Sequence, residues 1–392
     1  MDSIVNLVIA PNGLWEKIIF AFNNAFVSFA LSVIMLTICI KVIMLPFDFF
    51  NRYASEKTMR QQAQIAPEIE KIKRKYANDK QKENEEMQKL YKQKNVNPMG
   101  SCLFMLVNLA LTLTIFITLL NGLNTMASFK IQTQYEQLQQ AYVYEYVRIE
   151  HSVDIYKLVE DNSKLPEDQQ KSVYELVLPY ISEMNAIADE TTKTEVFGKA
   201  NKAVADKYEQ VKDSFLWIEN IWISDTPFSS SIPSFNDYAN VARLTAEQKA
   251  DETFKGTYNQ IMDPLRDTNG RANGFLILFV LTGVTAFLSQ WLMTKKSKKS
   301  AQPQVGTGKF MMFFMPAFMA IFTLMYTSMF SLYLVTSQLL SVATTPLIKL
   351  LVGKLANKSA KKAQEKQQVV VTNGVDYRRS EDTVIKRTKK KK

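Results

Sequence analysis

Long uncharged segments alternate along this chain with segments crowded with Lys, Glu and Gln. The uncharged segments are 18–40, which extends past Lys41 to Phe47, 101–129, 272–294 and 310–348. Each is as long as the roughly 20 residues that an α-helix needs to cross a bilayer. The last is long enough for two spans, with Tyr326-Thr327-Ser328 as the expected break. The pattern predicts an all-α polytopic membrane protein with transmembrane helices at 25–47, 102–124, 273–293, 310–326 and 329–348.

The distribution of charge predicts the orientation of these spans. Lys and Arg outnumber acids by 12 to 8 in 48–100, by 5 to 0 in 294–309 and by 14 to 4 in 346–392, whereas 130–270 has 14 basic and 24 acidic residues. Because short basic loops stay in the cytoplasm, the N-terminus is expected outside and the C-terminus inside. The connecting parts are an outer N-terminus (1–24), a cytoplasmic hairpin (48–101), an acidic outer insertion (125–272), a basic cytoplasmic loop (294–309) and a basic cytoplasmic tail (349–392).

Apolar residues at helical spacing in the first cytoplasmic segment predict a helical hairpin. A break at Ala77-Asn78-Asp79 separates two helices, and Pro98 ends the second. A solvated spacer is the alternative. The two apolar seams consist of Ile65, Ile69, Ile72 and Tyr76 in the first helix and Met87, Leu90 and Tyr91 in the second.

Two outer segments leave alternatives open. Trp15, Ile18, Ile19 and Phe22 recur at helical spacing, which suits a helix in the membrane interface or one packed on the bundle. In the insertion, Pro166, Pro179 and Gly198 are expected helix breaks. The apolar stretch 215–223, with two tryptophans, fits either the membrane interface or the core of an outer domain.

No catalytic or metal-binding constellation is evident. His151 is the only histidine, and Cys39 and Cys102 fall within predicted spans with no histidine near them in the sequence. The chain is therefore not expected to be an enzyme, and no cofactor is predicted. No cleavable signal peptide is recognised, since Asp2 follows Met1 and no basic segment precedes the first span.

Lys41 is the only charged residue within a predicted span. A lysine at the centre of a membrane helix costs about 2.5–3.5 kcal/mol, which either snorkelling to the headgroups or a wet interior would reduce. Span five has Tyr333, Ser337, Ser341 and Thr344 on one side with Gln338 beside them. Span three has Thr282, Thr285 and Ser289 with Gln290 beside them, and span two has Asn108 and Thr112. These side chains fit either interhelical hydrogen bonds or a hydrated cavity.

Four stretches together resemble the YidC/Oxa/Alb family of membrane protein insertases, in particular its bacterial YidC-like members. They are Lys41–Phe47, the hairpin from Pro67 to Cys102 with its NPMG ending, FLWIENIWISDTPF at 215–228, and MMFFMPAFMAIFTLMYTSMFSLYLVTSQL at 311–339. The resemblance implies five spans around a hydrophilic groove that opens to the cytoplasm and to lipid. By this resemblance, Lys41 stands where the family has an arginine. Asn108 stands where the family commonly has a glutamine in span two, and Gln338 where it commonly has an asparagine in span five, so both positions keep an amide. The candidate groove residues are Lys41, Asn108, Thr112, Gln290, Tyr333, Ser337 and Gln338.

The resemblance further implies the function and partners. We expect an insertase and chaperone of nascent membrane proteins in the bacterial plasma membrane, whose basic tail binds the ribosome or anionic membrane lipids, with a Sec translocon as a further candidate partner. One alternative is a small-anion transporter or channel subunit with Lys41 as the anion site. Another is a ribosome tether without an active groove.

The orientation can be tested with single introduced cysteines. An impermeant thiol reagent added outside intact cells should label a cysteine at Asp189 and leave cysteines at Lys80, Lys298 and Lys366 unlabelled. All four should react once the membrane is permeabilised. Labelling at Lys298 in intact cells would contradict the predicted orientation.

Overall fold

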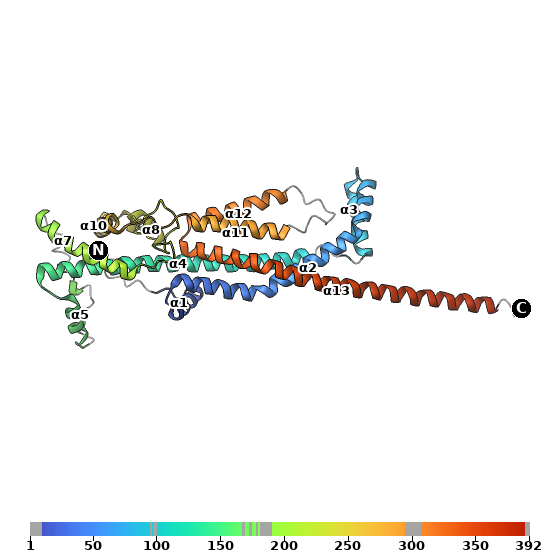
Figure 1. Cartoon of the computed structure of the whole chain (residues 1–392), viewed down its shortest axis with the longest axis horizontal. Helices are drawn as coiled ribbons and strands as arrows, with labels where there is room; N and C mark the ends of the chain where they lie inside the picture. The colour runs from blue at the N-terminus through green and yellow to red at the C-terminus, as the bar shows by residue number, and fades with distance from the viewer. Residues whose placement is uncertain are drawn as a thin grey trace. The chain divides into compact units, whose positions relative to one another are not determined.

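The structure, a computed structural model, describes residues 10–94, 96, 100–166, 169–171, 175–177, 179–180, 190–294 and 307–388. This part of the chain is all-helical apart from two isolated β-bridges, as the sequence predicts (Figure 1). It forms two compact units. Unit 1 consists of Met1–Lys41, Thr114–Leu288 and Lys309–Leu340, and unit 2 of Val42–Leu113, Ser289–Gly308 and Ser341–Lys392.

Three described helical segments are long and apolar enough to cross a membrane: Phe29–Lys75, Leu106–His151 and Ser328–Lys358. They belong to α2 (Phe29–Lys75), α4 (Gly100–His151) and α13 (Ser328–Thr388). Two shorter apolar segments, Ile277–Leu292 and Met312–Met325, lie in α11 (Ile277–Thr294) and α12 (Thr307–Met325). Because α12 ends at Met325 and α13 begins at Ser328, the expected break at 326–328 is confirmed.

The three longest helices continue beyond the predicted ends of their spans. α2 extends from the apolar segment through Pro46 and Pro67 to Lys75, α4 continues to His151, and α13 continues to Thr388. Backbone hydrogen bonds of an α-helix do not depend on side-chain polarity, and Gln, Glu and Lys favour helix nearly as well as Leu. A change from apolar to polar composition therefore marks the end of the apolar segment and not the end of the helix.

Helix α1 (Leu14–Phe26) packs against the bundle in unit 1. Ile19 is fully buried in the main hydrophobic core. Gly122 of α4 lies so close to α1 that a Cβ atom built on it would be 2.7 Å from the Cβ of Trp15. The contacts of Ile19 and Trp15 thus favour packing on the bundle, the second of the two alternatives for this segment.

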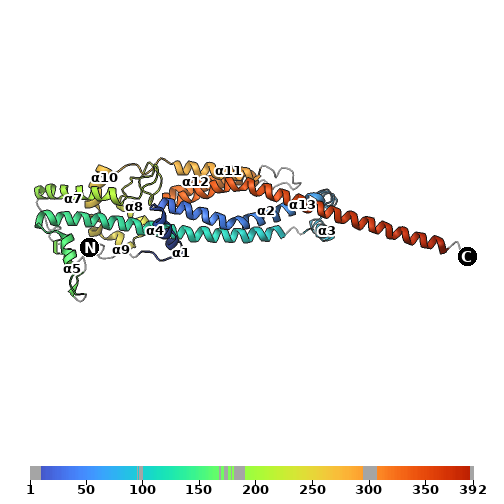
Figure 2. The same cartoon turned by 60° about the horizontal axis from the view of Figure 1, so that its bottom comes forward.

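The outer region of unit 1 consists of helices gathered around the end of α4 (Figure 2). They are α5 (Ile155–Ser163), α7 (Glu190–Val211), α8 (Phe235–Val241), α9 (Ala246–Ala250) and α10 (Glu252–Asn269). The expected break at Gly198 is wrong, because α7 runs through it. α5 ends before Pro166, and Pro179 borders residues outside the described part.

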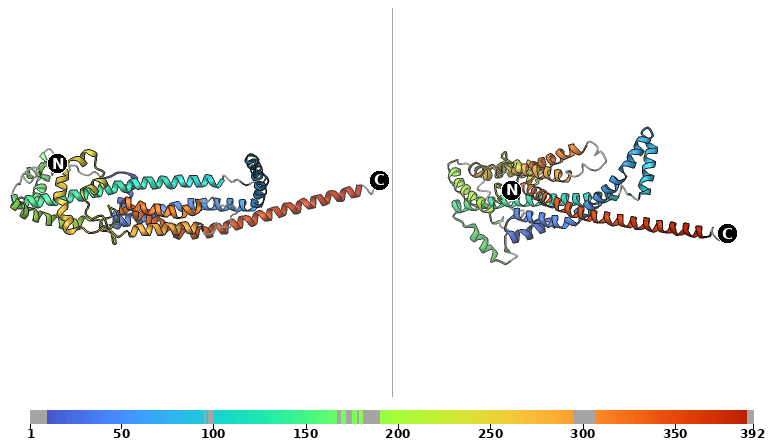
Figure 3. Two further views of the ribbon diagram at one scale, coloured as in Figure 1. Left: turned by 90° about the horizontal axis from the view of Figure 1, so that it is seen from above. Right: turned by 45° about the vertical axis from the view of Figure 1, so that its right-hand side comes forward.

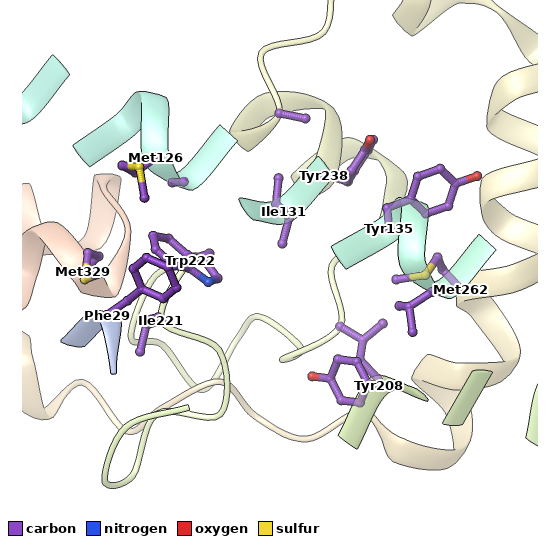
Figure 4. Close-up of a cluster of buried hydrophobic side chains, with 14 of the residues drawn as sticks. Phe29, Met126, Ile131, Tyr135, Tyr208, Ile221, Trp222, Tyr238, Met262 and Met329 are labelled. Atoms are coloured by element: carbon purple, nitrogen blue, oxygen red, sulfur yellow. The ribbon is translucent and has the colours of Figure 1, made fainter. Parts of the chain in front are cut away.

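Aromatic side chains form the core of this outer region. The rings of Tyr135, Tyr238 and Tyr258 contact one another with centroids 4.7–5.4 Å apart, and Phe235 and Phe254 pack at their edges. Figure 4 shows Tyr135, Tyr238 and Met262 in this cluster and Tyr208 nearby. Burial raises the pKa of Tyr208 to about 12, so this hydroxyl stays neutral at physiological pH.

The segment Asp213–Ile232, which we call the outer loop, binds the first residues of two apolar helices. The backbone oxygen of Ile223 accepts hydrogen bonds from Ser328 N (2.8 Å) and Oγ (2.7 Å) at the start of α13. The carboxylate of Asp225 accepts the N–H groups of Phe275 (2.9 Å) and Leu278 (2.7 Å) at the start of α11. The outer loop therefore supplies acceptors for N–H groups that have no partner within their own helix.

Trp222 links the outer loop to α2 and α4. Its side chain is fully buried, packs edge-on against Phe29 at 5.4 Å, and donates a 2.7 Å hydrogen bond to Asp213 (Figure 4). Lys130 of α4 pairs with the same carboxylate at 3.3 Å and lies 4.4 Å from the centre of the Phe29 ring. Trp222, Ile218, Ile221 and Ile223 are thus buried in protein, which favours the core alternative for most of the stretch 215–223, whereas Leu216 is 75% exposed.

Unit 2 contains the predicted cytoplasmic hairpin. α2 ends at Lys75, a turn follows, and α3 (Lys80–Gln93) returns alongside it (Figure 3). Asp79 caps α3 by accepting the N–H of Lys82, and Lys94 pairs with Glu68 at 2.7 Å across the hairpin. The two predicted seams, apart from Tyr76, meet in one small core, so the packed hairpin is favoured over a solvated spacer. The core contains Ile65, Ile69, Leu90 and Val96, with Ile72, Met87 and Tyr91 packed against it.

The caps formed by the outer loop can be tested with two glycines. A Cβ at Gly274 would come within 1.8 Å of Asp225 Oδ1, whereas one at Gly256 in α10 has nothing within 4 Å. Gly274→Ala should therefore displace the Asp225 carboxylate and destabilise the protein by about 1–3 kcal/mol. Gly256→Ala should be neutral or stabilise by up to about 1 kcal/mol, because alanine favours helix. Thermal unfolding of both variants in detergent measures the difference, and equal midpoints would contradict the capping role.

Candidate functional site

Lys41 lies on the protein-facing side of α2. Thr37, four residues earlier and 40° around the helix, is 2% exposed, and Met44, three residues later, is 7% exposed. Val42 and Ile43 on the opposite side are 57% and 67% exposed, and Lys41 itself is half-buried. The ammonium group therefore extends from the side of α2 that packs against protein, not from the side with exposed apolar residues.

α11 has the same division between a polar inner face and an apolar outer face. Thr282, Thr285 and Ser289 are buried, whereas Val280 and Val284 are more than half exposed. Thr285 Oγ1 donates to its own helix at 2.6 Å, but within the described residues no hydrogen-bond partner contacts Thr282 Oγ1 or Ser289 Oγ. Gln290 beside them is half-buried and has a polar partner.

α4 and α13 contribute the other candidate residues. In α4, Asn108 is half-buried and Thr112 is exposed. The Oδ1 atom of Asn108 is buried, with no hydrogen-bond partner among the residues that the structure describes. In α13, Tyr333 is buried against Phe330 with ring centroids 5.9 Å apart, and Ser337 and Gln338 are half-buried. Six of the seven candidates are thus at least half-buried, with Thr112 as the exception.

Lys41, Tyr333, Ser337 and Gln338 belong to unit 1, and Asn108, Thr112 and Gln290 belong to unit 2. Sequence reasoning missed further buried polar side chains, among them Thr37 in α2, Ser331 in α13 and Thr323 in α12. Thr37 could have been found, because it precedes Lys41 by one helical turn. Over the described residues, no group of three or more His, Cys, Asp or Glu is placed to hold a metal ion.

Three buried side-chain oxygens on apolar helices have no hydrogen-bond partner among the described residues, one in unit 1 and two in unit 2. A buried oxygen that lacks a hydrogen bond costs about 1–3 kcal/mol, and ordered water removes that cost. Asn108 Oδ1, Thr282 Oγ1 and Ser289 Oγ each have this property. Each of these oxygens is able to bind water or a polar group of another molecule.

A sequence model of the family described as "60Kd inner membrane protein" matches residues 21–357 of this chain, which include all of these helices up to the start of the basic tail. The chain belongs to the 60Kd inner membrane protein family. Membership agrees with the resemblance to YidC-like insertases seen in the sequence, and with a protein that crosses a bacterial membrane several times.

Relatives of this member of the 60Kd inner membrane protein family carry the name Membrane protein insertase YidC. The protein from Fusobacterium nucleatum is 42% identical over 96 residues, 24% of this chain and 45% of its own length. Those from Clostridium tetani and Nitratidesulfovibrio vulgaris are each 38% identical over 24% of this chain, covering 41% and 17% of their own lengths. Each match thus spans less than half of the relative. No solved structure matches the chain.

Asn108 provides a test of the hydrated interior. Replacing it with leucine removes a buried oxygen that has no hydrogen-bond partner in the described part of the chain, so Asn108→Leu should leave the free energy of unfolding unchanged or raise it by about 1 kcal/mol. The same change should lower insertion of a reporter membrane protein, because the inner surface loses its hydration. Thr118→Val is a matched control, since the Thr118 hydroxyl is exposed and bonds within its own helix. A stability loss specific to Asn108→Leu would indicate a structural hydrogen bond instead.

Proposed function

We propose that the protein is an insertase and chaperone for integral membrane proteins, with five spans around a hydrated, positively charged groove that opens to the cytoplasm and to lipid. The observation that supports it best is the position of Lys41 on the protein-facing side of α2, on a bundle whose other apolar helices also carry polar inner faces. The family and the names of the relatives agree with this function.

In this mechanism Lys41 attracts acidic residues in the outward-bound segment of an incoming polypeptide. The hydrated groove shortens the hydrocarbon path that those polar residues must cross. The substrate's apolar helix meanwhile leaves sideways into lipid, and its partition supplies the driving force without a nucleotide. α12 offers an apolar surface for such a step, because stacked rings from Phe310 to Phe318 are 41–64% exposed.

The partners follow from the same arrangement. Nascent membrane proteins are the substrates, and the basic tail brings the ribosome close through attraction to ribosomal RNA phosphates. Anionic lipid is a further partner for the tail. A Sec translocon is a further candidate partner of the protein. The N-terminus and the acidic insertion lie outside, and the hairpin α2–α3 and the tail lie in the cytoplasm.

The alternative of a small-anion transporter gains no support. The relatives found carry the insertase name, which does not favour a transport role for Lys41. A protein that only tethers the ribosome would need only the basic tail. That alternative does not account for the polar inner faces of the apolar helices.

Substitutions of Lys41 test the charge mechanism. Lys41→Arg should keep activity, because it keeps the charge. Lys41→Leu should reduce insertion of a single-span reporter with two Asp in its outward tail by about tenfold or more, and insertion of the same reporter with two Asn by much less. Lys41→Glu should be worse than Lys41→Leu, because it repels the acidic reporter. Protease protection of the reporter measures insertion.

The amount of insertase in the membrane must be the same for every variant. If the Leu variant inserts both reporters at wild-type levels, Lys41 is a snorkelling residue and its charge plays no part in insertion. If Lys41→Leu reduces insertion of both reporters by the same factor, the positive charge acts on the groove itself and not on the acidic residues of the substrate.

A further inference from the structure

A cavity of about 300 Å³ lies within unit 1, away from the candidate groove residues. The outer loop, the end of α8, the turn between α12 and α13, and α4 all contribute to its walls. Its polar lining includes Asn124, Ser224, Ser229, Arg243, Tyr326 and Thr327. This volume is at the small end of the range for ligand-binding pockets.

Several of these polar groups have no partner in the protein. Thr327 is 7% exposed, and its Oγ1 atom is buried with no hydrogen bond to any described residue. Arg243 is exposed and Asn124 is half-buried, and across the described part of the chain no ion pair or side-chain hydrogen bond engages the Arg243 guanidinium or the Asn124 amide. Side chains from three separate elements therefore line one cavity, and its exposed guanidinium is available to a polar group from outside the chain.

The backbone conformation of Arg243 is a second feature of this cavity wall. α8 ends with hydrogen bonds from Arg243 N to Asn240 O (3.3 Å) and from Leu244 N to Ala239 O (3.0 Å), and Arg243 has a φ of 58°. This left-handed position after a helix is normally glycine, because a Cβ atom makes it unfavourable. Arg243 is one of five non-glycine residues with a positive φ among the described residues, and glycine at this position would relieve the backbone strain.

The chemistry of the lining favours a phosphate group. A guanidinium binds phosphate through two parallel hydrogen bonds, and the hydroxyl and amide groups add further donors. The one carboxylate in the lining, Asp237, already accepts a 2.7 Å hydrogen bond from Ser234 Oγ. The unpaired groups are therefore mainly donors, which suits an anion.

The surroundings of the cavity favour a lipid over a soluble anion. Met325, the last residue of the apolar helix α12, lines the cavity and is 72% exposed, and Ile321 one turn earlier is 52% exposed. We propose that the cavity binds the phosphate of a glycerophospholipid from the outer leaflet, with the acyl chains lying along α12. The proposal uses the proposed outward position of this end of α12 and does not depend on insertase activity.

The test uses the full-length protein in detergent with added palmitoyl-oleoyl phosphatidylglycerol, and native mass spectrometry to count retained lipid. Arg243→Gly should weaken retention about tenfold, because it removes a charged, two-point contact. Its thermal midpoint should be equal to or above that of the wild type, since glycine suits the left-handed backbone. Arg271→Gln is the matched control: Arg271 is an exposed cation of the same unit, pairs with Glu219 and does not line the cavity, so lipid retention should be unchanged.

Thr327→Val separates binding from folding in a second way. Because the Thr327 hydroxyl has no protein partner, valine should not lower the thermal midpoint, but it should weaken lipid retention about threefold. Equal retention by wild type and Arg243→Gly would overturn the proposal. So would displacement of the lipid by inorganic phosphate at equal concentration, because the site would then be one for a soluble anion.

Discussion

In hydrocarbon, a polar group must find its partner within the protein or in trapped water, and this constraint governs the whole chain. It explains why the outer loop contacts the first residues of α11 and α13, where backbone N–H groups lack partners within their own helices. It also explains why buried threonine and serine side chains lie on the inner face of α11 while valines occupy the outer face. Thr282 Oγ1 and Ser289 Oγ have no hydrogen-bond partner among the described residues, and in the proposed function water or substrate satisfies them.

The same constraint makes Lys41 informative. A lysine within an apolar helix is unfavourable unless its charge is hydrated or paired. Its position next to Thr37 and Met44 keeps the side chain on the protein side of α2. Lysine retains the positive charge that the resemblance implies at this position, but it is a compact charge without the planar fork of arginine. Attraction of acidic residues needs only the charge, so the mechanism tolerates the exchange.

Much of the fold could be predicted from the sequence, because helical periodicity depends on local spacing. The seam of Ile65, Ile69 and Leu90 and the break before Ser328 appear in the structure as expected. The continuation of α4 to His151 could not be predicted from apolar composition, which reports on environment and not on backbone hydrogen bonding. Gly198 was misjudged for a related reason: a glycine in open space within a helix weakens it without ending it.

Contacts between segments that are distant in the chain could not be predicted from the sequence either. The burial of Trp222 depends on Phe29, Lys130 and Asp213, which its own neighbourhood does not reveal. The candidate groove residues were found by polarity against an apolar background, and that signal gives the face of each helix. It does not give the distance from one helix to the next.

The outer loop has a consequence for how the protein opens. Its carbonyl and carboxylate groups bind the starts of α11 and α13, and Trp222 joins the same loop to the start of α2. One segment of about twenty residues thus caps two apolar helices and packs against the start of a third. Local unfolding of the outer loop would remove the caps of α11 and α13 together, so we expect the first amide hydrogens of both helices to exchange with solvent at similar rates.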